Sequence, residues 1–289
     1  MFKTLIPFIF VLLWSTGFIG AKYGLIYAST GDFLTIRTLL NIAIFIVLVL
    51  VIKQQKLTTS QILHSMVTGA LIHGAYLGGC FAAIEYGIPA GMTAIIVGLQ
   101  PLLTAGLSIY LFNTSVTRAQ WIALVTGLCG LVLVVFSGIT TEKINLVALA
   151  YVLVALLGIT LGTLYQKRFC HQQAMLPSVL WQYVASLFVF LPIALAQSGK
   201  PVQWHPEFIA VLAWLVLAIS IASILLLLYM IKEGDAAKVT TYFYLVPPVA
   251  ALQAWVLFDE KVSQLSMIGM VLCAISVYVV IRRPLISSG

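Results

Sequence analysis

Residues 101–134 read PLLTAGLSIYLFNTSVTRAQWIALVTGLCGLVLV, and residues 247–280 read PPVAALQAWVLFDEKVSQLSMIGMVLCAISVYVV. With a constant offset of 146 residues and no gap, both stretches begin with proline and share the pair Phe112/Phe258. Two apolar stretches share some residues by composition alone. The paired prolines and the polar exits Phe-Asn-Thr and Phe-Asp-Glu at the same position are harder to obtain by chance. The pattern therefore indicates an internal duplication.

The duplication extends over the whole chain. An offset of 145 places Arg37 opposite Gln182, so residues 1–144 and 145–289 are interpreted as two five-helix halves. An odd number of spans in each half forces the second half to insert upside down relative to the first. Inverted repeats of this kind are typical of secondary transporters, in which the inward-open and outward-open forms arise when the halves exchange conformations.

The composition places the chain in a bilayer. Of 289 residues, 62% are hydrophobic and 8% are charged, and the mean hydropathy is +1.12. A soluble domain carries about 25% charged residues, and a disordered chain combines low hydrophobicity with high net charge, so both classes are excluded. Because a spanning helix takes about 20 apolar residues, we predict an all-α polytopic membrane protein with ten transmembrane helices. The predicted spans cover about 4–25, 32–52, 62–86, 90–112, 117–137, 145–167, 177–197, 207–231, 237–257 and 262–282.

The basic residues lie in the gaps between the apolar runs, which suits contacts with lipid headgroups rather than with nucleic acid. The net charge is +7, and ten Lys and Arg residues flank the spans on one side against four on the other. Cytoplasmic loops carry the excess of positive charge. We therefore expect both termini in the cytoplasm, with the chain in the cytoplasmic (inner) membrane. The first span follows Lys3 and is too long for the core of a signal peptide, so it is interpreted as an uncleaved helix.

Several motifs occur in an order that is specific when they are taken together. They are Trp14-Ser15-Thr16-Gly17-Phe18 and Lys22 in the first span, Phe33 and Arg37 in the second, Ala83 and Gly87-Ile88-Pro89-Ala90 at the end of the third, and Pro247, Phe258-Asp259-Glu260-Lys261-Val262-Ser263 and Gly269 near the end of the chain. In this order the chain resembles the EamA-type ten-helix exporters of the drug/metabolite transporter superfamily. It departs from their pattern at Ser15 and Gly17, and Asn113-Thr114-Ser115 stands where the first half normally has an acidic exit. The resemblance implies a permease, often an exporter of amino acids or other small metabolites, with a cavity between helices three, four, eight, nine, one and six.

Polar and aromatic side chains near the middle of the spans are the candidates for substrate binding, because such side chains do not face lipid. His73 and Tyr76 are three residues apart and share one helical face. Gln100 precedes Pro101, and a proline kink near mid-membrane frees backbone carbonyls, which points to a binding site. The candidate substrate-binding residues are Trp14, His73, Tyr76, Gln100, Tyr242 and Tyr244. His73 equally fits a proton relay or a hydrogen-bonded strut between helices, and Trp and Tyr also mark the membrane interface.

A second candidate is a charge cluster at the outer ends of the spans, formed by Lys22, Asp32, Arg37 and Glu85. Its functional interpretation is an outer gate, or a counter-charge for a substrate carboxylate. Its structural interpretation is a set of ion pairs whose long side chains reach the interface. If a proton is coupled to transport, Glu85 and His73 are its leading carriers.

Motifs for catalysis are missing from the sequence. It contains no G-x-x-x-x-G-K-[ST], no H-E-x-x-H, no G-x-S-x-G and no C-x-x-C, so we expect no ATP hydrolysis, no metal site, no cofactor and no enzymatic activity. The predicted function is a secondary transporter, in the export direction, for a small amphiphilic metabolite such as an amino acid, working by alternating access. The alternative is a membrane-embedded enzyme or lipid-handling protein without a recognisable motif. The expected partners are the substrate and the lipid bilayer, and a monomer is compatible with the sequence.

Overall fold

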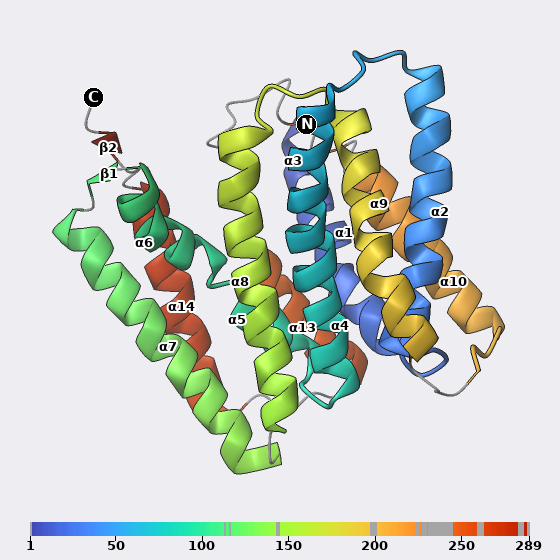
Figure 1. Ribbon diagram of the computed structural model, residues 1–289. Coiled ribbons are helices and arrows are strands. Elements are labelled where there is room, and N and C mark those ends of the chain that lie inside the picture. Colours follow the sequence, from blue (N-terminus) through green and yellow to red (C-terminus); the bar gives the residue numbers. More distant parts are fainter. Residues whose placement is uncertain are drawn as a thin grey trace.

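The computed structural model describes residues 2–112, 114–115, 117–142, 145–196, 201–223, 226, 230, 245–258, 263–282 and 286–287. In this part of the chain helices run up and down side by side (Figure 1), and the strands β1 (Thr114–Ser115) and β2 (Ile286–Ser287) have two residues each. The predicted all-α, multi-pass fold is therefore confirmed.

Several helices cross the bundle without interruption, and in the described part of the chain four of them are long and apolar enough to span a membrane. They are α1 (Phe2–Gly24), α2 (Thr30–Val51), α8 (Leu146–Phe169) and α9 (Met175–Ala196). Together with the stretches Thr59–Glu85 and Pro206–Ser223, these helices supply six segments that are long and apolar enough to span a membrane. Large apolar side chains on their outer faces are exposed, for example Leu195 at 79%. Such faces would be unstable in water and match a lipid environment.

Two spans change their helical geometry in mid-membrane. The third consists of α3 (Thr59–Gly69), the π-helical segment η1 (Ala70–Leu77) and α4 (Gly78–Glu85). The described part of the eighth contains α10 (Pro206–Trp214) and the π-helical segment η2 (Leu215–Ser223). In η2 the hydroxyl groups of Ser220 and Ser223 donate to backbone carbonyls five residues earlier, at 3.2 and 2.9 Å. Segments of this kind are rare and frequent at functional sites, and η1 and η2 begin 145 residues apart, the offset of the duplication.

The fourth span is broken at the expected place. Helix α5 (Ala90–Val97) ends at Gly98, and α6 (Gln100–Phe112) begins two residues later. Proline lacks an N–H and is therefore accommodated in the first turn of a helix, and Pro101 is the second residue of α6. The turn from α4 into α5 contains Gly87 at φ 102°, a conformation that residues with a Cβ rarely adopt.

Helices α7 (Arg118–Glu142) and α14 (Gln264–Arg282) lie side by side at one edge of the bundle (Figure 1). A Cβ on Gly127 would meet the Ser276 side chain at 2.7 Å, and a Cβ on Gly130 would meet Cys273 Sγ at 2.8 Å. With the offset of 146, Gly127 corresponds to Cys273 and Gly130 to Ser276. Exchanging the two halves of the chain therefore converts the contact of Gly127 with Ser276 into the contact of Gly130 with Cys273. The residue numbers rise on one helix as they fall on the other, so the two helices are antiparallel. A two-fold axis that relates them must run perpendicular to the helices.

Several other helix pairs follow the same exchange, whereas the extensive contact of α3 with α9 has no counterpart of similar extent between the described residues of α10 and α2. Helix α1 packs on α10 and η2, and its counterpart α8 packs on α3 and η1. Helix α1 also packs on α13 (Val246–Phe258), as α8 packs on α5 and α6. Exchanging the two halves converts α2 into α9 and α9 into α2, so this pair is unchanged. In Figure 1 the pair lies on the side of the bundle away from α7 and α14.

Candidate functional site

A cavity of about 120 Å³ lies in the middle of the bundle. It is lined from α1, α2, η1, α4, α8, α9 and η2 by Trp14, Gly17, Phe18, Ala21, Arg37, Ile72, His73, Tyr76, Leu77, Cys80, Phe81, Ile159, Tyr183, Ile219 and Ser220. A water molecule needs a cavity of about 10–15 Å³, so this cavity is large enough for several waters or a small solute. Both π-helical segments contribute to the lining, so the two irregular stretches of backbone face the same space.

Segment η1 carries two of the expected residues into the cavity. The imidazole of His73 stacks on the ring of Tyr183 in α9, with 4.5 Å between the ring centroids. Behind Tyr76, a Cβ on Gly158 would approach the Tyr76 backbone nitrogen to 2.8 Å. Helix α8 therefore rests directly on the backbone of η1, which fixes the segment against its neighbour. Trp14 enters from α1 and packs on Phe10, with ring centroids 5.4 Å apart.

Arg37 extends into this cavity from α2. Its side chain is 6% exposed, and its Nη2 group donates to Ser220 Oγ over a long 3.5 Å. Its Nε has no hydrogen-bond partner. Its electrostatic neighbours are His73, Tyr76 and Tyr183. No carboxylate is among the described residues that line the cavity.

The expected charge cluster is divided in the structure. The Glu85 carboxylate accepts a 3.3 Å hydrogen bond from the Thr30 backbone N–H at the start of α2. Asp32 accepts from the hydroxyl of Ser29, which caps the same helix, at 2.7 Å, and the Lys22 ammonium lies 3.9 Å from the ring centroid of Phe258. Arg37 lies apart from these contacts because it is seven residues into α2, about 10 Å below the first residue of the helix.

The remaining candidates lie elsewhere. The Gln100 amide donates to the Thr163 hydroxyl on α8 at 3.0 Å, and Gln100 is not among the residues that line the cavity. Tyr242 and Tyr244 lie outside the described residues. The expected contribution of helix four is also missing, because no described residue of α5 or α6 lines the cavity. Helices two and seven contribute instead, through Arg37 and Tyr183.

Two lining residues, Tyr183 and Ser220, were not among the candidates. The internal duplication could have indicated Tyr183, because the preceding residue, Gln182, aligns with Arg37. Ser220 belongs to an apolar run whose serines look like ordinary helix residues, and only the π-helical geometry turns this one toward Arg37.

An aromatic layer closes the cavity toward the end of the bundle that carries Tyr27, Glu85 and Glu207, here named the Tyr27 end. Phe33 packs between Phe81 and Phe208, with ring centroids 5.3 and 5.2 Å apart. All three rings are buried, and Phe81 also lines the cavity. Phe208 continues the layer to the Tyr27 ring at 6.4 Å.

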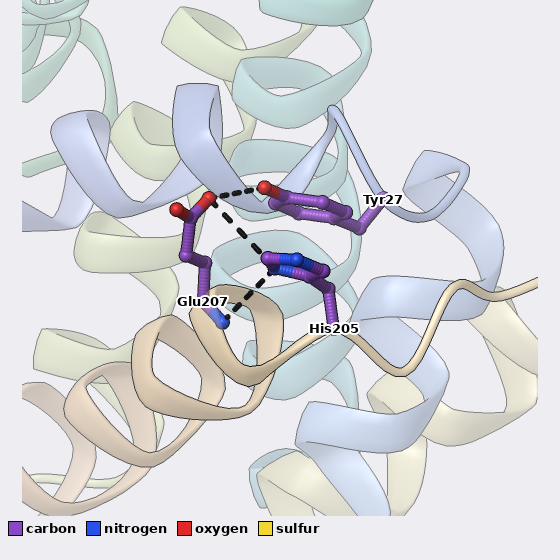
Figure 2. Close-up of polar contacts among 3 residues, drawn as sticks. All are labelled: Tyr27, His205 and Glu207. Carbon is purple, nitrogen blue, oxygen red and sulfur yellow. Dashed lines mark hydrogen bonds and ion pairs between the residues drawn. The ribbon is translucent and has the colours of Figure 1, made fainter.

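A polar cluster covers this aromatic layer (Figure 2). The Tyr27 hydroxyl donates to the Glu207 carboxylate, and the His205 ring stacks on Tyr27 at 5.2 Å between centroids, with 2° between the ring planes. The Tyr27 carbonyl also accepts from the Gln203 N–H at 2.9 Å. The hydrogen bond to Glu207 raises the pKa of Tyr27. These contacts join the turn between α1 and α2 to the start of α10.

In the described part of the chain, no group of three His, Cys, Asp or Glu side chains is arranged to hold a metal ion. The candidate site is a mostly apolar cavity with one guanidinium and a few hydroxyl and imidazole groups. Such an arrangement suits the binding of an amphiphilic solute.

The model of the EamA-like transporter family matches residues 2–136 and again residues 142–282. A Bacillus subtilis relative, named as the uncharacterized transporter YvbV, is 23% identical over 93% of this chain and 88% of its own. A Salmonella typhimurium relative, named "Probable amino-acid metabolite efflux pump", is 22% identical over 93% of this chain and 91% of its own. A Rickettsia prowazekii relative, named as an S-adenosylmethionine uptake transporter, is 25% identical over 58% of this chain and 55% of its own. A solved crystal structure shares the fold with a TM-score of 0.62 at 21% identity, over 96% of this chain and 95% of that one.

Proposed function

Because this chain belongs to the EamA-like transporter family, we propose that it moves small amphiphilic metabolites, such as amino acids and related compounds, across the cytoplasmic membrane by alternating access. The observation that carries the proposal is the central cavity, whose lining combines Arg37 with the apolar side chains of Trp14, Phe18 and Ile219. A solute with one charged end and one apolar end matches both parts of this surface.

The two-fold relation between the helices supports the alternating-access part of the proposal. We assign residues 1–144 and 145–289 to two inverted repeats, whose exchange of conformations would open the cavity to either side in turn. In the present conformation the Tyr27 end is closed by Phe33, Phe81 and Phe208. The distribution of Lys and Arg assigns this end to the periplasm and both termini to the cytoplasm, which makes the aromatic layer a closed outer gate.

The names of the relatives support amino acids and related metabolites as substrates and export as the direction. Relatives in Salmonella typhimurium and Escherichia coli are named as amino-acid metabolite efflux pumps. The Rickettsia relative is named as an uptake transporter, so the fold serves both directions.

The decisive experiment is transport by the purified protein in liposomes loaded with radiolabelled leucine. We expect protein-dependent release of leucine that is recovered chemically unchanged. Tyr76→Ala, in the cavity, should slow the release, whereas Tyr110→Ala, at a side chain that is 80% exposed on α6, should not. Conversion of the solute to another compound would support the alternative of a membrane-embedded enzyme, and equal effects of both substitutions would refute the assignment of the cavity.

A further inference from the structure

We propose that Arg37 is the carboxylate anchor of the cavity and that the transporter selects apolar monocarboxylates whether or not they carry an α-amino group. The inference rests on the proposed function and deepens it, because it states which part of an amphiphilic solute the cavity recognises. Its basis is one guanidinium that is buried in a membrane cavity without an anionic partner among the described residues.

The first step concerns the charge. A cationic side chain inside a membrane normally pairs with an anion or with backbone carbonyls. The groups around Arg37 are the imidazole of His73 and the phenols of Tyr76 and Tyr183, and none of them is an anion at neutral pH. The cavity therefore holds a positive charge that a bound anion would neutralise.

The second step concerns the geometry of the guanidinium. Its Nε and Nη2 groups lie on the same edge, and two parallel N–H donors on one edge match the two oxygens of a carboxylate. Nε has no hydrogen-bond partner, and Nη2 reaches only Ser220 Oγ at 3.5 Å. This edge is buried and largely unpaired, so a carboxylate would pair with it once the neighbouring side chains make room.

The third step concerns the remainder of the solute. The described lining contains no carboxylate that could pair with an ammonium group, and its other surfaces are mainly apolar and aromatic. An α-amino group in the cavity would lose its hydration without gaining an ion pair. The deaminated acid should therefore bind at least as tightly as the amino acid, and the amine without its carboxylate should bind poorly.

The test measures binding to the full-length protein in detergent with four probes of one shape: leucine, 4-methylpentanoate, 4-methylpentanamide and 3-methylbutylamine. We expect 4-methylpentanoate to bind at least as tightly as leucine. We expect 3-methylbutylamine to bind at least about tenfold more weakly than leucine, because it lacks a hydrogen-bonding partner for the charged guanidinium. Arg37→Gln should lower the affinity for the two acids by about tenfold or more and leave the affinity for the amide unchanged. Arg37→Lys should keep the preference for acids with lower affinity, because an ammonium cannot offer the planar edge. Arg118→Gln, at the exposed start of α7, is the matched control and should behave as the unchanged protein.

A purely structural arginine gives a different result. If Arg37 is held by an ion pair within the protein, Arg37→Gln should lower the melting temperature and weaken all four probes alike, which would overturn the proposal. With an unpaired buried charge, the substitution should keep or raise the melting temperature, and only the acids should raise that of the unchanged protein. Strong binding of 3-methylbutylamine would also overturn it. Flux in liposomes is measured separately. Selective binding of the acids without any flux would refute the transport function. Flux that is unchanged by Arg37→Gln would refute the role of Arg37 as the carboxylate anchor.

Discussion

Replacing Gly69 with alanine should destabilise the protein and widen the cavity at the same time. Gly69 is the last residue of α3, and a Cβ at this position would lie 2.2 Å from the carbonyl oxygen of Gln182 on α9. Real Cβ atoms essentially never approach a neighbour closer than 3.0 Å, so the two helices must separate by at least the difference, 3.0 − 2.2 = 0.8 Å. The obstacle is backbone, which cannot rotate away as a side chain would.

The expected magnitude combines two opposing effects. Overpacking of a close contact costs about 1–3 kcal/mol, and alanine in a helix gains about 1 kcal/mol over glycine. Because the obstacle is backbone, the cost lies at the upper end of this range, and the net loss of unfolding free energy is about 2 kcal/mol. Because Gln182 precedes Tyr183, the shift should also loosen the 4.5 Å stack between Tyr183 and His73 and weaken ligand binding to the cavity.

The assay is unfolding in detergent by heat and by denaturant, with ligand affinity measured on the folded fraction. Gly106→Ala on α6 is the matched control, because a Cβ there meets no atom within 4 Å. The control should be as stable as the unchanged protein or more so. If Gly69→Ala were equally stable, α3 and α9 would not be in close contact, and the reasoning would fail.

Three further predictions concern other parts of the molecule. Gln100→Ala should lower stability by about 1 kcal/mol, the usual range for a hydrogen bond between membrane helices, because it removes the bond to Thr163. Flux per folded molecule should change little. A selective loss of flux would instead show that Gln100 contributes to substrate binding. Glu207→Gln should lower the pKa of Tyr27, because the carboxylate stabilises the neutral phenol. The contribution of this hydrogen bond to stability is complete below the ordinary tyrosine pKa and is lost as the pH rises through the raised pKa. The pKa can be measured by ¹³C-tyrosine NMR, with Tyr27→Phe to assign the signal. A reporter fused to either terminus should be active only in the cytoplasm, and periplasmic activity at one end would contradict the even number of spans.

The course of the spans could be predicted because hydropathy and charge set where a helix enters and leaves a membrane. The predicted span 145–167 is α8, Leu146–Phe169, and the break before Pro101 follows from the missing N–H of proline. The π-helical geometry of Ala70–Leu77 could not be predicted, since its sequence ALIHGAYL reads as any apolar helix. It depends on contacts with α8 and α9 that are far away in the chain.

The candidate site could be predicted only in part. Trp14, His73 and Tyr76 line one cavity, as mid-span polar and aromatic residues should if they avoid lipid. Arg37 was grouped with the charges at the outer ends because distance along a helix does not reveal which neighbour the side chain meets. Gln100 looked available beside its helix break, but a single hydroxyl, that of Thr163, provides its partner. The surroundings of Arg37 and Gln100 depend on contacts between helices that are far apart in the chain, and the local sequence pattern does not predict such contacts.

The charge of Arg37 also gives the transport cycle an electrical asymmetry. In the proposed alternating-access cycle, a monocarboxylate without an ammonium group neutralises the guanidinium, so the loaded carrier would reorient without moving net charge. The empty carrier moves one positive charge through the membrane field, and an inside-negative voltage draws it back toward the cytoplasm. This step is worth about 2.3 kcal/mol per 100 mV, or about fiftyfold in the ratio of substrate across the membrane. With a single cation among the described lining residues, the voltage would thus drive export of monocarboxylates without a coupled ion, whereas a zwitterionic amino acid leaves the charge of Arg37 in place.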